Sequence, residues 1–435
     1  METNYKKIFL DKIVKKKLVI GVIGLGYVGL PLAILLSKKG FKTYGFDTDK
    51  NKIKSIYSKK SYIERIKNSD INFLLKKGSF FFDFKHISLC DVIIICVPTP
   101  LYKGKPDLSY IRKTIISISK YLRFGQAIIL ESTSYPGTTE EEIVSKLKQK
   151  FTIGKNFFVG FSSERINPGE NENKLKTIPK VVSGLSQNCL SIIYKFYDTF
   201  FNKVVRAKSI KIAEFSKLLE NIYRAVNIGF INEMKFIADK MNTDIYEIIK
   251  IANTKPYGFV RFNPGPGVGG HCIPIDPNYL YWKAKKLGIS ANFIKLSAET
   301  NIKVINFIKL KILRTLKTSN IDKTKAKILI LGLSYKKNID DLRESSSLKL
   351  IKLLKDNNIN KIEFSDPHIK KNIQTRDYNI KLKNTKLTTK NLLSFDIVII
   401  MTDHDKFDYK KIYKHSKHVI DCRGRFKTDH KVSRG

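Results

Sequence analysis

The amino-acid sequence predicts an α/β protein in which two parallel sheets, one toward each end of the chain, are joined by a long central helix and a helical middle domain. Residues 17–201 alternate short apolar runs with amphipathic segments, as strand–helix–strand units do. The same alternation resumes at residue 325, and D-V-I-I-I-C from Asp91 is echoed by D-I-V-I-I-M from Asp396. We therefore expect domains at residues 1–206, 207–320 and 321–435.

The first predicted elements are a strand, a glycine turn and a helix. Residues 18–24 read as a buried strand, residues 32–39 as a helix and residues 42–46 as a second strand. Between the first strand and the helix lies G-L-G-Y-V-G, the pattern with which dinucleotide-binding Rossmann domains approach a pyrophosphate closely. The cofactor-binding residues expected here are Gly24, Gly26, Tyr27, Val28 and Gly29. A tight turn that binds nothing is the alternative.

Asp47 follows the second strand, 23 positions after the first glycine of the turn. A carboxylate at this place accepts hydrogen bonds from both ribose hydroxyls of an adenosine and repels a 2′-phosphate. The sequence therefore predicts NAD rather than NADP as the cofactor.

Four more apolar runs predict the remaining strands of the first sheet, at residues 92–97, 127–130, 157–161 and 181–183. Polar loops follow three of these strands and contain Pro98, Thr99, Thr133 and Glu164. Ligands of open α/β sheets gather beyond the carboxyl ends of the strands, so we expect these loops to line the nicotinamide site.

The rest of the chain reads as helices followed by a second sheet. Residues 208–240 contain no proline and place apolar residues at helical spacing, which predicts a long connecting helix. More helix is expected to about residue 317. The second sheet is predicted from a helix at residues 346–355 and strands at residues 361–364, 397–400 and 418–421. It has Gly332 but no G-x-G-x-x-G, so it need not bind a dinucleotide.

The most informative stretch of the chain is the loop at residues 263–277, N-P-G-P-G-V-G-G-H-C-I-P-I-D-P. Its glycines let the backbone approach a ligand and its prolines limit the loop's freedom, so that Cys272 can be presented outward. A thiol becomes a strong nucleophile as the thiolate, which needs a nearby cation or base. The alternative is a Gly/Pro connection around a buried cysteine. His271 has no partner at ligand spacing, and we predict no metal.

The chain is strongly basic, with a formal net charge of +42 from 81 Lys and Arg against 39 Asp and Glu. The cations are spread along the whole chain, whereas a nucleic-acid-binding protein gathers them in a stripe. We expect only weak, salt-sensitive binding of polyanions and no specific nucleic-acid partner. Without an 18-residue apolar stretch or a secretory leader, the sequence predicts a cytoplasmic protein with no membrane partner. The five cysteines form no C-x-x-C pair, so neither a disulfide framework nor a zinc site is expected.

Six motifs follow one another along the chain: G-L-G-Y-V-G-L-P-L-A, E-S-T-S-Y-P-G-T-T, E-R-I-N-P-G, K-L-L-E-N-I-Y-R-A-V-N-I, P-G-P-G-V-G-G-H-C-I-P-I-D-P and L-G-L-S-Y-K-K-N-I-D-D-L-R-E-S-S-S. In this order they resemble the UDP-glucose/UDP-mannose dehydrogenase family over nearly the whole chain. G-G-H-C-I-P-I-D-P together with Y-L-Y-W-K-A is most similar to the UDP-N-acetylglucosamine 6-dehydrogenases.

The resemblance implies a four-electron oxidation of a sugar C6 alcohol to a carboxylate with two NAD in succession. Cys272 would capture the aldehyde as a thiohemiacetal and carry the acid as a thioester. The resemblance also assigns catalytic roles to Lys217, Asn221, Asp276, Glu164 and Thr133. The alternative for Lys217 is a solvated surface lysine, and for Glu164 a surface acid paired with Arg165. A second family glutamate is replaced by Pro168, so the acid that activates the hydrolytic water is left open.

The resemblance further implies residues that bind the nucleotide sugar. They are Glu164, Arg165, Lys217, Asn221, Arg261, Asn263, Gly267, Tyr335, Lys336 and Arg423. Arg343 is expected to contact NAD, and His271 to help discriminate the substituent at the sugar's C2. Gly424 departs from the family, which commonly has Asn after the arginine, and this puts the contact at Arg423 in doubt.

Together these observations predict an NAD-dependent UDP-N-acetylhexosamine 6-dehydrogenase that acts on UDP-N-acetylglucosamine, supplies a uronic acid for surface polysaccharide and, by resemblance, forms a homodimer. UDP-glucose, UDP-N-acetylgalactosamine and UDP-N-acetylmannosamine are the alternative substrates. A two-electron hydroxy-acid dehydrogenase is an alternative of another reaction class, and it would not need Cys272. A basic nucleic-acid-binding protein is the non-enzymatic alternative.

Overall fold

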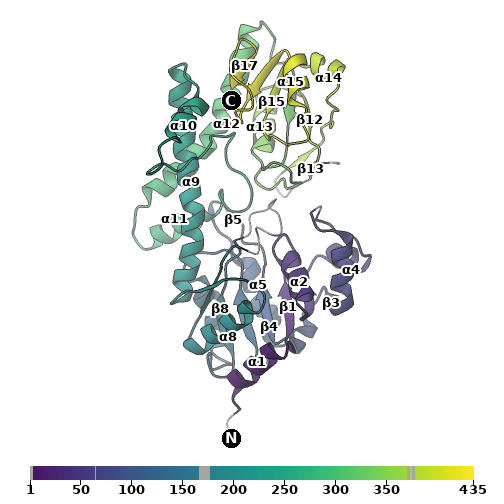
Figure 1. Ribbon diagram of the computed structural model, residues 1–435, viewed down its shortest axis with the longest axis vertical. Helices are drawn as coiled ribbons and strands as arrows, with labels where there is room; N and C mark the ends of the chain where they lie inside the picture. The colour runs from purple at the N-terminus through teal and green to yellow at the C-terminus, as the bar shows by residue number, and fades with distance from the viewer. Residues whose placement is uncertain (1–2, 64, 166–176, 370–372, 375–377) are drawn as a thin grey trace. The chain divides into compact units, whose positions relative to one another are not determined.

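The computed structural model describes residues 3–63, 65–165, 177–369, 373–374 and 378–435, and the chain divides into two compact units, Met1–Glu220 and Asn221–Gly435 (Figure 1). The predicted long helix is confirmed as α9 (Ile210–Lys240), which begins in the first unit and ends in the second. The division into three domains stays a prediction.

The first unit is built on an eight-stranded sheet with the strand order β10-β9-β8-β7-β4-β1-β2-β3. Its strands are β1 (Val19–Ile23), β2 (Lys42–Phe46), β3 (Gly78–Phe81), β4 (Val92–Ile95), β7 (Ala127–Leu130), β8 (Phe158–Phe161), β9 (Lys180–Gly184) and β10 (Val204–Arg206). Neighbouring strands run parallel except β8 and β9, where Gly160 pairs antiparallel with Gly184. Ile23 lies in register with Phe46 and Ile95, so the loops after β1, β2 and β4 leave the same end of the sheet.

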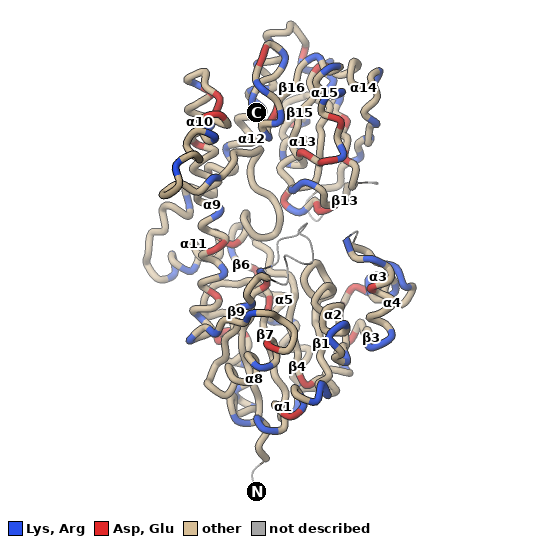
Figure 2. Tube along the Cα trace, viewed as in Figure 1, with Lys and Arg blue, Asp and Glu red and all other residues tan. Residues whose placement is uncertain are grey.

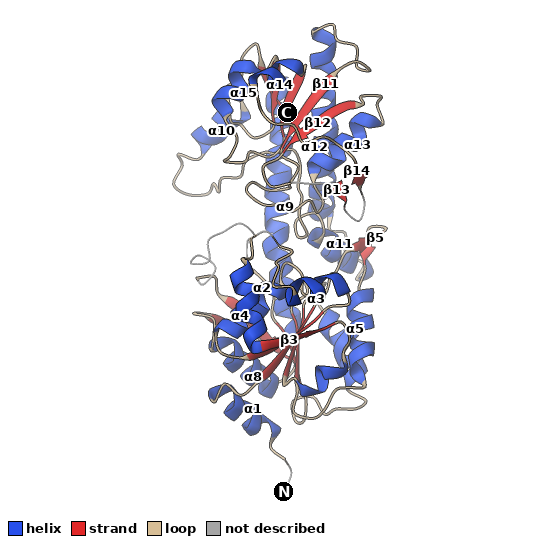
Figure 3. Cartoon of the chain, turned by 90° about the vertical axis from the view of Figure 1, so that its right-hand side faces the viewer, coloured by secondary structure: helices blue, strands red, loops and turns tan. Residues whose placement is uncertain are grey.

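Helices cover both faces of this sheet (Figure 3). They are α1 (Tyr5–Val14), α2 (Gly29–Lys38), α3 (Lys50–Tyr57), α4 (Asn68–Lys77), α5 (Ser109–Ser119), α6 (Ser145–Leu147), α8 (Gln187–Asp198), the 3₁₀ turn η1 (Lys85–Leu89) and the π-helical segment η2 (Thr139–Val144). Helix α2 packs on β1 and β2, and α8 packs on β8 and β9. Their apolar side chains form one continuous core with the sheet, which confirms the predicted fold class.

Helix α1 was not expected, because the basic N-terminal stretch reads as running straight into the first strand. The side chain of Asn4 accepts a hydrogen bond from the backbone N–H of Lys7 and caps the helix. Phe9 and Ile13, four residues apart on one face, are buried in the core. The charged residues Asp11 and Lys12 between them conceal this short apolar stripe in the sequence.

The second unit contains a five-stranded sheet of order β12-β11-β15-β16-β17, all parallel. Its strands are β11 (Lys327–Leu331), β12 (Lys361–Ser365), β15 (Ile397–Ile400), β16 (His418–Asp421) and β17 (Val432–Arg434). Its helices are α10 (Ile245–Ala252), α11 (Asp276–Lys286), α12 (Asn292–Thr318), α13 (Ser346–Lys355), α14 (Thr389–Ser394) and α15 (Tyr409–His415). Apolar residues of α12 and α13 form a core on one face of the sheet, and those of α14 and α15 form a core on the other.

Two small hairpins complete the described structure. Strands β5 (Leu101–Tyr102) and β6 (Lys105–Pro106) pair after β4, and β13 (Ile373–Gln374) pairs with β14 (Asn379–Ile380) after β12.

Candidate active site

The turn between β1 and α2 is as tight as the glycine pattern predicts. Gly24 has φ +90°, and a Cβ there would lie 2.6 Å from the carbonyl oxygen of Cys96. A Cβ at Gly29 would lie 1.9 Å from the carbonyl oxygen of Gly24, so the helix can start this close to the strand only with glycine. At Gly26, by contrast, a Cβ would meet no atom of the described residues within 4 Å. The middle glycine therefore faces open space.

Asp47, the acid after β2, faces the same turn. Its Oδ2 accepts hydrogen bonds from the backbone N–H of Leu25 at 2.9 Å and from Nζ of Lys52 at 2.8 Å. The turn also holds Tyr27, whose carbonyl oxygen accepts a hydrogen bond from Arg65, and Val28, which precedes α2. Open space over Gly26, the N-terminus of α2 for a pyrophosphate and a carboxylate for a ribose fit NAD.

Three further predicted cofactor or catalytic residues follow neighbouring strands. Thr99 comes after β4, Thr133 after β7 and Glu164 after β8. Ile95 lies in register with Leu130, and Leu130 with Phe161, so these loops leave the same end of the sheet. Thr99 is buried and Thr133 is half-buried.

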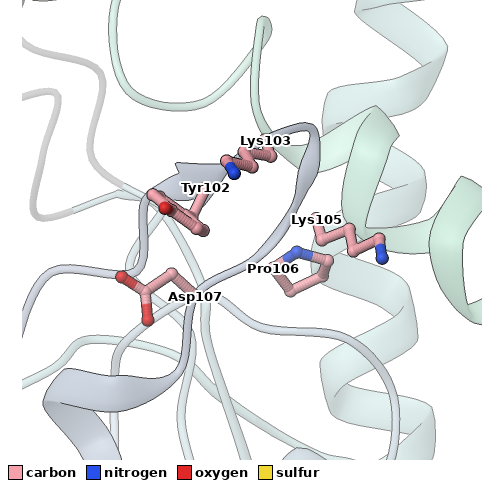
Figure 4. Close-up of a pocket in the computed structure, with 5 residues that line it drawn as sticks. All are labelled: Tyr102, Lys103, Lys105, Pro106 and Asp107. Atoms are coloured by element: carbon pink, nitrogen blue, oxygen red, sulfur yellow. The ribbon is translucent and has the colours of Figure 1, made fainter.

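The loop of Pro98 and Thr99 continues into the β5–β6 hairpin, which forms a shallow hollow. The lining residues are Tyr102, Lys103, Lys105, Pro106 and Asp107 (Figure 4). Figure 4 shows the Tyr102 ring and the Asp107 carboxylate on one side of the hairpin and the Lys105 ammonium on the other. Asp107 accepts a hydrogen bond from the backbone N–H of Ser109 at the start of α5. None of the five was predicted as a site residue.

Sequence reasoning missed a buried ion cluster at the same end of the sheet. Nζ of Lys180, at the start of β9, lies 3.0 Å from Oε2 of Glu131 and 3.6 Å from Oε2 of Glu164. The Tyr197 hydroxyl of α8 donates a hydrogen bond to the other oxygen of Glu131. Arg165, the expected partner of Glu164, instead pairs its guanidinium with Glu220 at 2.6 Å. The sequence signal for this cluster was the lysine that begins the apolar run K-V-V-S-G.

Glu214 of α9 is a second buried charge that the sequence did not reveal. Its carboxylate accepts hydrogen bonds from the backbone N–H of Gly137 at 2.5 Å and from the N–H and hydroxyl of Thr139 at 2.9 and 2.7 Å. Burial raises the pKa of Glu214 to about 7. Lys217 lies three residues further along α9 and is also buried, with 6% of its surface exposed, so it is no solvated surface lysine.

In the second unit, two buried side chains of α9 form hydrogen bonds with the cysteine loop, residues 263–277. Oδ1 of Asn232 accepts a hydrogen bond from the N–H of Gly265 at 3.1 Å, and Nζ of Lys235 donates to the Gly265 carbonyl at 3.2 Å. Cys272 is half-buried, whereas Cys90, Cys189 and Cys422 are fully buried. Burial raises the pKa of the Cys90 and Cys422 thiols to about 12, so neither is a nucleophile.

The structure brings two predicted catalytic residues together. Asp276 is buried at the start of α11, and its backbone N–H donates to the Cys272 carbonyl at 2.8 Å. The side-chain amide of Asn221 donates a hydrogen bond to the Asp276 carboxylate, and Arg224 donates to the Asn221 oxygen. The carboxylate, the amide and the cysteine backbone thus form one connected group.

Predicted substrate residues of the second unit also gather on the cysteine loop. The Tyr335 ring packs on Gly270, whose φ is +82° and whose Cβ would lie 2.8 Å from the ring, and the Gly270 N–H donates to the Arg343 carbonyl at 2.9 Å. Nη1 of Arg423 lies 3.1 Å from the place of a Cβ on Gly265. Gly424 has φ +69°, and a Cβ added there would lie 2.5 Å from the Tyr246 ring. An Asn would therefore not fit at this position without rearrangement.

The remaining predicted residues lie apart from this group or outside the described residues. Nε of Arg261 donates to Asn263 at 3.1 Å on the exposed part of the loop. Arg343 is held by Asp341, at 2.7 to 3.0 Å. Lys336 is half-buried. A Cβ added to Gly267 would lie 3.1 Å from Ser346 Oγ. Pro168 lies outside the described residues.

Three further features of the described residues bear on partners. Over these ranges, no three or more His, Cys, Asp or Glu side chains stand close enough together to hold a metal ion. No helix in the described part of the chain combines the length and the apolar character needed to cross a membrane. Lys and Arg recur along the traces of both units (Figure 2). The cytoplasmic location stays a prediction.

A dinucleotide turn with its ribose-facing acid, in a chain whose second sheet lacks that turn, defines a nicotinamide-dependent dehydrogenase with a separate domain for its substrate. Family models match three consecutive stretches: the UDP-glucose/GDP-mannose dehydrogenase family NAD-binding domain at residues 18–201, central domain at 211–303 and UDP-binding domain at 329–428. The chain belongs to this family of NAD-dependent UDP-sugar dehydrogenases, oxidoreductases that act on CH–OH groups. The resemblance seen in the sequence and the NAD prediction are confirmed, with GDP-mannose in the family description in place of the expected UDP-mannose.

Some of the proteins similar to this chain are named for N-acetylated sugars. The chain is 35% identical to protein CapL of Staphylococcus aureus, with 94% of this chain and 96% of CapL covered. It is 34% identical to the UDP-N-acetyl-D-glucosamine 6-dehydrogenase of Pseudomonas aeruginosa, with 90% and 92% covered. The solved UDP-D-ManNAc dehydrogenase of Pyrococcus horikoshii superposes with a TM-score of 0.83 at 30% identity, with 94% and 96% covered.

Proposed function

We propose that this enzyme oxidises the C6 alcohol of UDP-N-acetylglucosamine to the uronic acid in a four-electron reaction that serves surface polysaccharide synthesis. The observation that carries the proposal is the cysteine loop. It places a half-buried thiol four residues before a buried carboxylate that is hydrogen-bonded to Asn221 of α9. A two-electron dehydrogenase would need no such thiol, and relatives at 32–34% identity are named for UDP-N-acetylglucosamine and UDP-N-acetylmannosamine.

In the proposed reaction, Cys272 carries the sugar through two covalent intermediates. Bound NAD supplies a nicotinamide ring that accepts a hydride. The C6 alcohol first gives up a hydride and its hydroxyl proton and becomes an aldehyde. The Cys272 thiolate then bonds to the aldehyde carbon, and the adduct is a thiohemiacetal that cannot diffuse away. Loss of hydride from that carbon leaves a thioester on Cys272. Water then bonds to the thioester carbon, the carbon–sulfur bond breaks, and the acid is released while the sulfur returns to thiolate.

Lys217 and Asn221 stabilise the oxyanion of the tetrahedral species. They are four residues apart on α9 and therefore share one face of the helix. Asp276 holds the Asn221 amide in place. Removal of one oxyanion donor costs enzymes about 10²–10³ in kcat, so Asn221→Ala is expected to fall in that range. Thr133 holds the water, and Glu164 accepts its proton.

We further assign the nucleotide sugar to the second unit, where the UDP-binding domain matches. The loop at Asn263 and Gly267, together with Tyr335, Lys336 and Arg423, binds the nucleotide, and Arg261 adds a guanidinium suited to diphosphate oxygens. His271, beside the reacting cysteine, contacts the C2 substituent. Arg343 is already held by Asp341, so its contribution is to support Gly270 and the loop more than to contact NAD.

A substrate panel tests the choice of sugar. We expect kcat/KM for UDP-N-acetylglucosamine to exceed that for UDP-N-acetylmannosamine, UDP-N-acetylgalactosamine and UDP-glucose by at least about tenfold each, which corresponds to about 1.4 kcal/mol. His271→Ala should narrow the gap between the acetylated sugars and UDP-glucose. A higher kcat/KM for any of the other three sugars would replace the proposed substrate.

Cys272→Ser tests the covalent step. The variant should bind NAD as the unmodified enzyme does and form no uronic acid. Cys189→Ser is the control, because Cys189 takes no part in the proposed chemistry and serine keeps the hydrogen bond that its sulfur accepts from the Val159 N–H. Full uronic acid production by Cys272→Ser would refute the assignment.

We also propose that the enzyme is a homodimer formed through α9. In the second unit, three apolar side chains at intervals of seven residues are exposed on this helix: Tyr223 at 49%, Phe230 at 55% and Ile237 at 48%. An apolar stripe of this kind is characteristic of a helix that packs against a partner. Light scattering should show a dimer, and Phe230→Glu with Ile237→Glu should shift it to monomer; a monomeric unmodified enzyme would contradict the proposal.

A further inference from the structure

A buried group of charges in the first unit contains two residues, Lys180 and Glu131, that have no place in the chemistry above. Lys180 is 3% exposed and opens β9, with Nζ 3.0 Å from Glu131 Oε2 and 3.6 Å from Glu164 Oε2. Glu131 is fully buried, whereas the Glu164 side chain is 16% exposed. One buried ammonium therefore lies between a sealed carboxylate and a carboxylate that reaches solvent.

The groups that face Lys180 come from four segments. They are Glu131 after β7, Glu164 after β8, Tyr197 of α8 and the Cys96 thiol after β4. Burial by itself lowers the pKa of Lys180, but the negative charges of Glu131 and Glu164 outweigh it and leave the pKa raised. The Tyr197 hydroxyl donates to Glu131, which keeps that carboxylate an acceptor. Lys180 is thus a fixed cation.

The contacts around Glu164 hold its carboxylate in place. Arg165, the cation next to Glu164 in sequence, is drawn away by Glu220 at 2.6 Å and by the Pro179 carbonyl at 2.8 Å. The backbone N–H of Arg165 donates to Oε1 of Glu164 at 2.7 Å, while Lys180 lies against Oε2. Both carboxylate oxygens therefore face a donor or cation.

We infer that Lys180 is a positioning residue for hydrolysis of the thioester: it holds the Glu164 carboxylate in place, with Glu131 and Tyr197 as its buried supports. The inference rests on the proposed role of Glu164. In that step a water oxygen bonds to the thioester carbon, its proton passes to Glu164, and sulfur leaves as thiolate, with no change in oxidation state. Loss of Lys180 removes the cation that lies 3.6 Å from Oε2 of Glu164, and with it the contact that fixes this oxygen.

The test follows the acyl-enzyme as a function of pH. Enzyme with UDP-N-acetylglucosamine and NAD is quenched in acid, and its intact mass shows the fraction carrying a sugar on the cysteine. For Lys180→Gln we expect the acidic limb of kcat to move up by about one pH unit, with about tenfold lower kcat on that limb and the adduct accumulating there. KM for both substrates should change less than about twofold, and the adduct should clear at high pH. Lys180→Arg should restore the limb, and Lys195→Gln, on the exposed side of α8, should leave it unmoved.

A second pair of variants covers the case in which Lys180→Gln does not fold. Glu131→Gln with Lys180→Met removes the buried ion pair together, a change that proteins often tolerate. Compared with Glu131→Gln alone, it differs only in the cation beside Glu164. The inference predicts a more alkaline acidic limb in the double variant. If the acidic limb of kcat lies at the same pH in the single and the double variant, or if kcat falls equally at every pH, Lys180 is a structural residue and the inference is overturned.

The two proposals fail separately. An unmodified enzyme that forms no adduct and one NADH per sugar would remove the thioester and the proposed function with it. An unmodified enzyme that forms the adduct, together with Lys180 variants of unchanged pH profile, would remove only the role of Lys180.

Discussion

Each unit places an aspartate after the second strand of its sheet, and the two carboxylates differ in whether a ligand can reach them. Asp47 after β2 accepts a hydrogen bond from the Leu25 N–H, and Asp366 after β12 accepts one from the Leu333 N–H at 2.7 Å. Asp47 also accepts a hydrogen bond from the Asp49 N–H at 2.9 Å and pairs with Lys52, whose side chain is 31% exposed, while the Asp47 side chain is 8% exposed. Asp366 is sealed with 0% exposure against the equally buried His404, at 3.1 Å. The first carboxylate can receive a ribose, and the second has no room for one.

The first glycines of the two turns are alike, and the turns differ two residues later. Gly24 has φ +90° and Gly332 has φ +81°, and a Cβ added to either would lie 2.6 Å or less from a neighbouring atom. Gly26 faces a volume in which, within the described ranges, no atom lies inside 4 Å of an added Cβ, whereas the corresponding position of the second unit is the fully buried Ser334. A shared strand–turn topology therefore serves a ligand in the first unit and packing in the second, which is why fold alone does not locate a cofactor.

The largest effect is expected from Asp366→Ala. Burial by itself raises the pKa of Asp366, but hydrogen bonds from His404 and backbone amides hold it below its ordinary value. Removal of this carboxylate leaves those donors buried without an acceptor and should cost about 3–5 kcal/mol. The chain's single tryptophan, Trp282 of α11, reports unfolding of the second unit by fluorescence in denaturant. NAD affinity should not change, and Asp322→Ala, at an exposed position, is the control.

Glu214→Gln extends the comparison to a buried acid of the first unit. The folded pKa of Glu214, about 7, lies above the ordinary value of 4.5, so the folded state binds the extra proton between these values. Stability from this group is therefore complete below about pH 4.5 and is lost as the pH rises to about 7, by up to about 3 kcal/mol. The unfolding free energy of the unmodified chain relative to Glu214→Gln, measured by circular dichroism, should fall over this window. A difference that is flat with pH would contradict the assignment.

Gly26→Val and Gly332→Ala test the two turns separately. Valine at position 26 fits the protein but occupies the space for the dinucleotide, so the Kd for NAD should rise at least about tenfold with unchanged Tm. Alanine at position 332 should lower the stability of the second unit by about 1–3 kcal/mol without changing the Kd for NAD. Interchanged outcomes would mean that the roles of the two turns are reversed.

The smallest effect is expected from Asp47→Asn. Loss of the charge weakens acceptance from the ribose hydroxyls and removes repulsion of a 2′-phosphate, so the preference for NAD over NADP should fall by about 1–2 kcal/mol. Competitive titration with both cofactors measures the ratio. Asp49→Asn removes a neighbouring charge but keeps the helix cap of α3, and it should leave the ratio unchanged.

Local patterns were enough for the parts of the structure that depend on neighbours in sequence. The glycine turn with Asp47, the apolar strands, α9 and the cysteine loop could all be predicted because their signals are periodic or contiguous. The contacts of Lys180 with Glu131, of Glu214 with Thr139 and of Lys235 with Gly265 could not be predicted, since each joins residues 30 or more positions apart. A lysine in a lysine-rich chain looks solvated until its tertiary partners are known, and Lys180 has two.

The stoichiometry of NADH to product tests the central claim most directly. Purified enzyme given a limiting amount of UDP-N-acetylglucosamine and excess NAD should form two NADH for each molecule of sugar acid, because the alcohol and the cysteine-bound aldehyde each surrender a hydride. One NADH per sugar, with the aldehyde as the product in solution, would contradict the thioester route.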